Sequence, residues 1–173
     1  RVDNGITYIL PTVVQGVTAQ VQYSTAASGA EASVAGSPNY SESTGLSIKY
    51  ASGAVLAGLG YINIKDDSSA ASPAGDQRAN ATLVYGGYDL GMAKVIAYFD
   101  SETKAAERLT VLGVKAIVPV TADLTVQAGV SRAKNVNGLA ATNDDAVVTA
   151  VKAVYKLSKR TSVYGLGTIV NNE

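Results

Sequence analysis

VVTAVKAVYKLSKRTSVYGLGTIV, residues 147–170, is the stretch that decides the fold. Two runs in which apolar residues alternate with small or polar ones flank a short basic turn, KLSKRT at 156–161. A period of two residues is typical of a β-strand rather than a helix. Tyr155 and Tyr164 stand beside the turn, and we expect each to lie on the more apolar face of its strand. Tyrosines gathered at strand ends indicate a membrane protein, because there the ring lies at the headgroup level with its hydroxyl in water.

The composition argues against an enzyme. The 173 residues include no Cys, His or Trp, but 10 Tyr and 17 Gly. Without Cys there is no thiolate metal site, and without His the usual general base near neutral pH is missing. We therefore expect no catalytic residue and no cofactor. The acidic runs at 65–67 and 143–145 could hold a divalent cation, but solvated loops are the favoured interpretation, so no metal site is expected. A formal net charge of zero gives no sign of a nucleic-acid partner.

The alternation at the C-terminus recurs along the whole chain. No run of 18 apolar residues occurs, so no transmembrane helix is expected. Strands of a membrane barrel alternate apolar and polar residues, so a search for long apolar runs does not detect them. The pattern predicts ten strands, at 5–10, 16–24, 44–51, 54–63, 78–86, 91–100, 108–118, 123–132, 147–156 and 162–171.

The connections between these strands alternate in length. The short ones are expected at 11–15, 52–53, 87–90, 119–122 and 157–161, and the longer ones at 25–43, 64–77, 101–107 and 133–146. Such alternation places short turns at one edge of a sheet and long loops at the other, as in an up-and-down outer-membrane barrel. A soluble sandwich with Greek-key crossovers does not separate its loops in this way. The sequence predicts an all-β, transmembrane, antiparallel up-and-down β-barrel with one domain over 1–173.

The tyrosines predict two aromatic girdles. Those expected beside short turns are Tyr8, Tyr50, Tyr85, Tyr155 and Tyr164, and those expected at the long-loop ends are Tyr23, Tyr61 and Tyr98. Two aromatic rows one strand length apart are typical of a membrane barrel. The alternative is that Tyr is simply a good strand former. That alternative explains tyrosines within strands but not their crowding at strand ends.

The charges predict a wet inner face. We expect all acidic residues in loops, turns or strand edges, whereas Lys49, Arg78, Lys115 and Lys152 fall within strands. A charge on the lipid face costs about 2–4 kcal/mol at the midplane, so the face that carries these residues is expected to meet water. We expect these four to line a pore, together with Arg1, which precedes the first strand.

Three motifs resemble the Gram-negative general porins of the betaproteobacterial type. The run YKLSKRT at 155–161, with Val163-Tyr164 and then Asn171-Asn172, is similar to that family's late Y-x-L-S-K-R-T-x-[LV]-Y hairpin. The run NGITYILP at 4–11 resembles its N-S-[IV]-R-Y-x-S-P strand, and GVKAIVP at 113–119 resembles its G-V-x-[VP] strand. The chain departs from the family at Thr7 and Ile9, where porins usually carry a charged pair.

The resemblance implies a sixteen-stranded barrel, usually trimeric, whose pore is narrowed by an inward-folded loop. The first predicted strand resembles the strand that follows this loop in the family. The ten strands are therefore expected to form the middle-to-late part of a barrel, and the barrel is expected to be incomplete at both ends. The implied function is passive diffusion of small hydrophilic solutes and ions across the outer membrane. The basic residues expected to line the pore add a preference for anions. Outer-membrane lipid, lipopolysaccharide and two further copies of the chain are the implied partners. The alternative is a barrel that serves as an anchor or adhesin and binds partners through its long loops.

Overall fold

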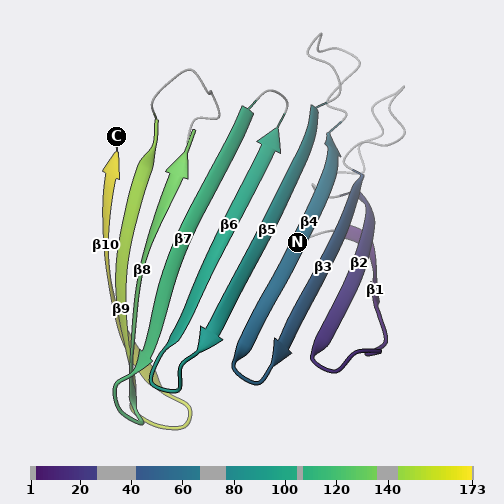
Figure 1. Ribbon diagram of the computed structural model, residues 1–173. Coiled ribbons are helices and arrows are strands. Elements are labelled where there is room, and N and C mark those ends of the chain that lie inside the picture. Colours follow the sequence, from purple (N-terminus) through teal and green to yellow (C-terminus); the bar gives the residue numbers. More distant parts are fainter. Residues whose placement is uncertain (1–2, 27–41, 67–76, 105–106, 136–143, 173) are drawn as a thin grey trace.

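A computed structural model describes residues 3–26, 42–66, 77–104, 107–135 and 144–172. They form one antiparallel sheet of ten strands in chain order (Figure 1). The strands are β1 (Asp3–Ile9), β2 (Val17–Ala26), β3 (Ser43–Ser52), β4 (Val55–Asp66), β5 (Gln77–Asp89), β6 (Lys94–Lys104), β7 (Glu107–Pro119), β8 (Leu124–Lys134), β9 (Ala146–Lys156) and β10 (Ser162–Asn172). Each strand pairs with its neighbours in sequence, which confirms the predicted up-and-down meander. Within the described residues, no helix has the length and hydrophobicity needed to cross a membrane.

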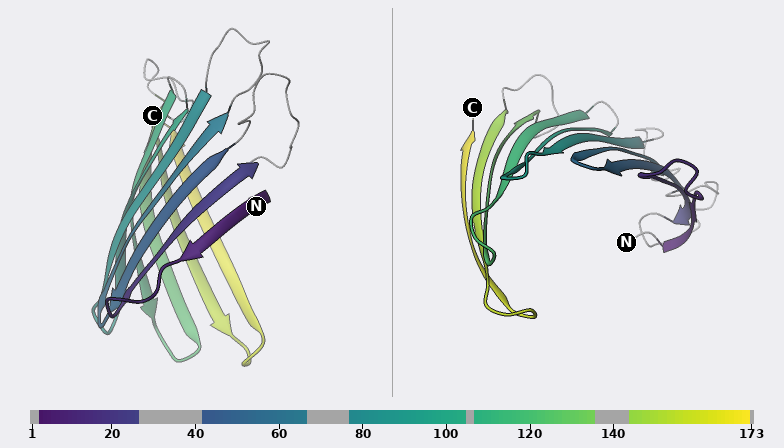
Figure 2. Two further views of the ribbon diagram at one scale, coloured as in Figure 1. Left: turned by 90° about the vertical axis from the view of Figure 1, so that its right-hand side faces the viewer. Right: turned by 60° about the horizontal axis from the view of Figure 1, so that its bottom comes forward.

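The sheet is strongly curved. Viewed from the end, the strands follow an arc that runs from β1 at one edge to β10 at the other (Figure 2). The short turns gather at one end of the strands (Figure 1), and the strand ends that border the longer sequence segments lie at the opposite end. This separation agrees with the alternation of connection lengths in the sequence.

The link between β6 and β7 is shorter than the sequence predicts. A medium-long loop was expected at 101–107, but β6 continues to Lys104 and β7 begins at Glu107. Lys104 pairs directly with Glu107, and Glu102 with Leu109. Charged residues suggested a loop here, yet a strand accommodates them where one of its faces meets water. The expectation that all acids lie in loops or at strand edges is therefore wrong for this segment.

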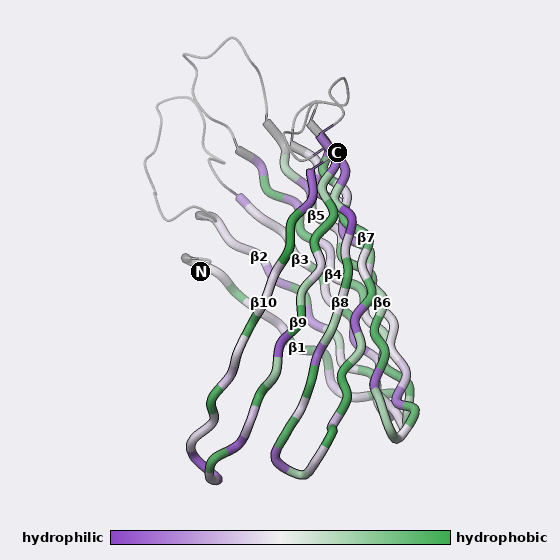
Figure 3. Tube along the Cα trace, turned by 90° about the vertical axis from the view of Figure 1, so that its left-hand side faces the viewer, coloured by the Kyte–Doolittle hydropathy of each residue, from purple (hydrophilic) through white to green (hydrophobic). Residues whose placement is uncertain are grey.

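The register divides the sheet into two faces, because residues directly opposite each other on paired strands point the same way. We call the face of Tyr50, Leu59 and Val114 the apolar face, and the face of Lys49 and Lys115 the lysine face. Along several strands, hydrophobic and hydrophilic residues alternate (Figure 3). Large side chains on the apolar face, such as Leu112 and Val151, are at least half exposed in the isolated chain. An exposed apolar surface of this extent marks a contact with lipid or protein.

Polar contacts border the apolar face at its long-loop end. Nζ of Lys65 donates a hydrogen bond to Oε2 of Glu42 over 3.0 Å, and the backbone N–H of Lys65 donates to the carbonyl of Glu42 over 2.8 Å. The Tyr23 side chain also hydrogen-bonds to the Glu42 carboxylate. Hydrogen bonds from Lys65 and then from Tyr23 lower the pKa of Glu42 below its ordinary value of 4.5. Glu42 thereby ties β2, β3 and β4 together where they leave the apolar region.

The Glu42 contact predicts a pH-dependent contribution to stability. A carboxylate with a depressed pKa stabilises the folded state above its ordinary pKa, and that stabilisation is lost as pH falls through the folded value. We expect Glu42→Gln to lower the free energy of unfolding at pH 7 by about 0.2–1 kcal/mol, the range for exposed ion pairs. The loss should vanish at a pH where Glu42 of the parent is protonated. Urea unfolding of detergent-solubilised protein, followed by circular dichroism at both pH values, measures it.

The matched control is Lys65→Gln, which removes the largest cause of the pKa shift and leaves the carboxylate in place. It should reproduce the pH dependence of Glu42→Gln. A loss in Glu42→Gln that is the same at both pH values would contradict an electrostatic role for this contact.

Candidate functional site

The lysine face is the less exposed face of β8 and β9, as expected for the inside of the curve. Three hollows, of about 310, 240 and 310 Å³, open on it and are lined mainly by its residues. The register places Lys49 of β3, Lys115 of β7 and Lys152 of β9 on this face, as the sequence predicts. Within the described part of the chain, none of these lysines has an acidic side chain within ion-pair distance. Such charges need water around them, because an unpaired ammonium group is strongly destabilised in an apolar medium.

The other two predicted pore-lining residues are Arg78 and Arg1. Arg78 pairs in the backbone register with Lys65. The side chain of Arg78 lies outside the described residues, so its place on the pore-lining face stays a prediction. Arg1 lies outside the described residues.

Two tyrosines lie flat along the lysine face. Tyr85 of β5 and Tyr98 of β6 are directly paired, and each leans away from the other onto a glycine. A Cβ added to Gly58 would lie 2.3 Å from Cζ of Tyr85, and one added to Gly113 would lie 2.4 Å from Cζ of Tyr98. Each ring therefore occupies the space that a side chain on the neighbouring strand would fill. We call Gly58 and Gly113 the glycine seats.

Three of the predicted girdle tyrosines are thus on the wrong face. Tyr8, Tyr23, Tyr50, Tyr61 and Tyr155 lie on the apolar face as expected. Tyr85, Tyr98 and Tyr164 share the face of the lysines, since the register aligns them with Gly58, Gly113 and Val154. Tyr88, which pairs with Val55 and Val95, lies on the apolar face and was not predicted there.

The length of the turn before β10 decides which of its residues lie on the lysine face. Five residues, 157–161, separate β9 from β10, and Lys156 pairs with Ser162. Tyr155 is therefore opposite Val163, and Tyr164 falls on the other face. There the ammonium group of Lys152 lies 4.9 Å from the centroid of the Tyr164 ring, a cation–π contact.

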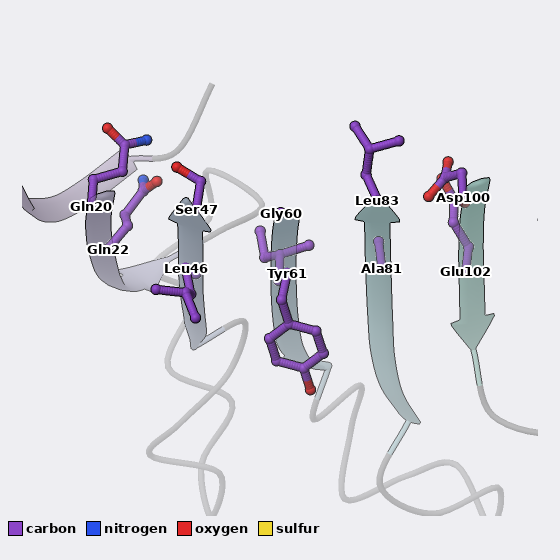
Figure 4. A pocket seen from close by; sticks show the side chains of 12 residues that line it. Gln20, Gln22, Leu46, Ser47, Gly60, Tyr61, Ala81, Leu83, Asp100 and Glu102 are labelled. Carbon is purple, nitrogen blue, oxygen red and sulfur yellow. The ribbon is translucent and has the colours of Figure 1, made fainter. Parts of the chain in front are cut away.

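The lysine face also carries acids that the sequence pattern did not place there. Asp100 pairs with Leu83 and Val111, and Glu102 with Ala81 and Leu109, all on the lysine face. Both acids line a hollow whose opposite side carries Gln20 and other polar groups (Figure 4). The spacing of Tyr98, Asp100 and Glu102 by two residues is the signal that could have found them.

Asp100 and Glu102 are separated from Lys115 and Lys152 along the strands. On β6, Asp100 and Glu102 follow Tyr98 toward the long-loop end. Lys115 pairs with Ile96, which precedes Tyr98 toward the short turns. Lys152 is nearer still to the short turns, since it pairs with Gln127, the partner of Ile117.

In the described residues no group of three or more His, Cys, Asp or Glu side chains is placed to hold a metal ion.

The apolar face ends in polar contacts near Tyr61. The Tyr61 hydroxyl donates to Oδ1 of Asn80 over 3.1 Å, and the Asn63 amide donates to the same oxygen. These groups follow Leu59 on the same face of β4. A tyrosine with its hydroxyl bound to polar groups is typical of the border between the apolar and aqueous zones of a membrane protein.

A curved meander with one exposed apolar face and one charged concave face defines a transmembrane β-barrel wall. The whole chain, residues 1–173, matches the sequence model of the Gram-negative porin family. The chain belongs to the Gram-negative porins, which are outer-membrane proteins and not enzymes. No curated protein sequence matches it.

Solved structures of porins share the fold. A porin refined at 1.8 Å resolution is 16% identical, with a TM-score of 0.68, over 96% of this chain and 55% of that chain. OmpT of Vibrio cholerae is 13% identical, with a TM-score of 0.66, over 97% of this chain and 53% of that chain. OmpF of Salmonella typhi, solved in complex with daunomycin, is 17% identical, with a TM-score of 0.69, over 93% of this chain and 52% of that chain. The chain therefore spans about half the length of the structures that it matches.

Proposed function

We propose that the full-length protein forms a water-filled channel for passive diffusion of small hydrophilic solutes and ions. The observation that carries this proposal is the position of Lys49, Lys115 and Lys152 on one concave face, without acidic partners in the described part of the chain. The opposite face is apolar and exposed over the same strands. Ammonium groups on the inside of a lipid-facing wall require an aqueous interior.

The rest of the assembly follows from family membership as part of the same proposal. Additional strands close the barrel, because an open sheet edge in lipid leaves backbone groups without hydrogen-bond partners. Tyr23 and Tyr61, with their polar neighbours, mark the outer headgroup level, and Tyr50, Tyr88 and Tyr155 mark the inner one. We also propose a homotrimer in contact with lipopolysaccharide. The hairpin at 155–164 supports the betaproteobacterial type within the family.

The channel is proposed to favour anions weakly. Rings of Lys raise the local concentration of anions in a narrow aqueous bore. Asp100 and Glu102 lie on the same face and offset part of this effect. Lys94 contributes little, because its ammonium group lies 3.5 Å from Oδ2 of Asp89.

Ion selectivity tests the proposed role of the lysines. We expect the reversal potential of the full-length protein in a KCl gradient across a planar bilayer to show a chloride preference. Lys115→Glu combined with Lys152→Glu should lower or invert the preference. The effect should fade with rising salt, because the Debye length falls from about 10 Å at 0.1 M to about 3 Å at 1 M.

The matched control changes charge in the opposite direction. Asp100→Asn with Glu102→Gln should raise the chloride preference, since it removes negative charge from the same face. Cation selectivity in the parent that neither pair of substitutions alters would mean that these wall residues do not govern permeation.

The glycine seats predict a change in single-channel conductance. Adding a methyl group at Gly58 and Gly113 must move the tips of Tyr85 and Tyr98, because a Cβ would lie 2.3–2.4 Å from their ring atoms. We expect the displaced rings to project into the bore. Single-channel conductance of Gly58→Ala/Gly113→Ala should fall by roughly tens of per cent, because the displaced rings narrow the aqueous bore that carries the ions.

Gly60→Ala is the matched control, since Gly60 lies on the same face of β4 and a Cβ there meets nothing within 4 Å. Its conductance should equal that of the parent. Replacing both tyrosines by Ala in the double glycine variant should restore the lost conductance. A double glycine variant that conducts like Gly60→Ala would show that the rings do not stand in the permeation path.

A further inference from the structure

A hollow of about 240 Å³ on the lysine face combines two cations with an apolar wall. It lies over β8 and is bordered by Lys115 on β7 and Lys152 on β9. Gly129 lies between them and contributes no side chain to the floor. A Cβ at Gly129 would lie 3.0 Å from Cβ of Lys115, so this glycine lets the lysine stem pack close to β8. The hollow is small beside the roughly 300–1,000 Å³ of pockets for drug-sized ligands.

The polar side of the hollow suits a small anion. Within the described residues, its lining includes no acidic side chain. The ammonium group of Lys152 is positioned by the Tyr164 ring, 4.9 Å away at the centroid, and this contact leaves its charge unneutralised. Lys115 is exposed and can turn toward the same anion on its flexible stem. Gln127, which pairs with Lys152, and Ser131 add hydrogen-bond donors.

The apolar side of the hollow suits a flat hydrocarbon group. Tyr98 lines it, and its ring lies along the wall in the space left by the missing side chain of Gly113. Val148 and Leu166 complete this side, and Leu166 is 62% exposed. Aromatic rings pair favourably with another ring in offset-stacked or edge-to-face arrangements. A bare inorganic anion would leave this surface in contact with water.

We propose that this hollow is a binding site for small aromatic carboxylates, with the carboxylate between Lys115 and Lys152 and the ring against Tyr98 and Leu166. The site rests on the proposed channel function, and it makes the wall hold such solutes briefly during passage. Binding is weak, because the ammonium groups remain partly in water.

The probe is para-fluorobenzoate, added to the full-length protein in planar bilayers in KCl. We expect it to reduce the ionic current saturably. Acetate, which lacks the ring, and benzamide, which lacks the charge, should reduce it much less at equal concentration. Lys115→Gln combined with Lys152→Gln should raise the half-blocking concentration by about threefold to tenfold, the change expected when two partly exposed ion pairs are lost.

The matched control is Lys49→Gln, which removes one lysine from the same face but outside the hollow. It should raise the half-blocking concentration much less than the double lysine variant does, because it changes only the general charge of the bore. Tyr98→Leu should weaken the block by para-fluorobenzoate and leave the effect of acetate as it was. An equal loss in Lys49→Gln and in the double lysine variant would overturn the site, because it would mean that the overall charge of the bore governs the block.

A binding measurement separates this proposal from the channel itself. Fluorine NMR line broadening of para-fluorobenzoate on detergent-solubilised protein needs no ion current. Absence of current in the parent would overturn the channel, while broadening that disappears in the double lysine variant would still support the site. Broadening that persists unchanged in that variant would overturn the site even in a conducting channel.

Discussion

The structure depends on one constraint: backbone hydrogen bonds between consecutive strands fix which residues share a face. In lipid, each N–H and C=O group must find a partner within the protein, so a wall of antiparallel strands permits no unpaired segment within the bilayer. Once the register is set, the period of two assigns every side chain to lipid or to the inside. A shift of one residue would exchange Lys115 with Val114 and place a charge in the membrane. The apolar surface and the lysines are thus two results of the same pairing.

The fold could be predicted because its signals are distributed over the chain. Alternation in β2, β3, β7 and β8 was regular enough to locate each strand, and the register places their alternate residues on two faces. Strand ends were less predictable. Residues 101–104 were predicted as part of a loop because they are polar, whereas polarity at the end of a barrel strand only means that the strand has passed beyond the lipid.

The site was only partly predictable, because the sequence does not always show which face of a strand a residue lies on. Lys49, Lys115 and Lys152 were found because apolar residues flank each on both sides. In β10 both faces carry apolar residues, so the facing of Tyr164 is decided by the five-residue turn at 157–161 and not by composition. In β5 and β6, Tyr85 and Tyr98 resemble lipid-facing girdle residues. Their place on the inside depends on Gly58 and Gly113, which are distant in sequence and adjacent only through the register.

The separation of charge along the strands has an electrical consequence. Asp100 and Glu102 lie toward the long-loop end of the wall, and Lys115 and Lys152 toward the short-turn end. These four side chains give the wall a fixed axial dipole, beside the net charge on which the proposed selectivity rests. Cations and anions that enter such a bore meet their regions of lowest potential at different depths. In the proposed channel, opposite polarities of applied voltage would drive ions over unlike energy profiles. The wall would then act as a weak rectifier, and the direction of rectification would report the orientation of the barrel in the bilayer.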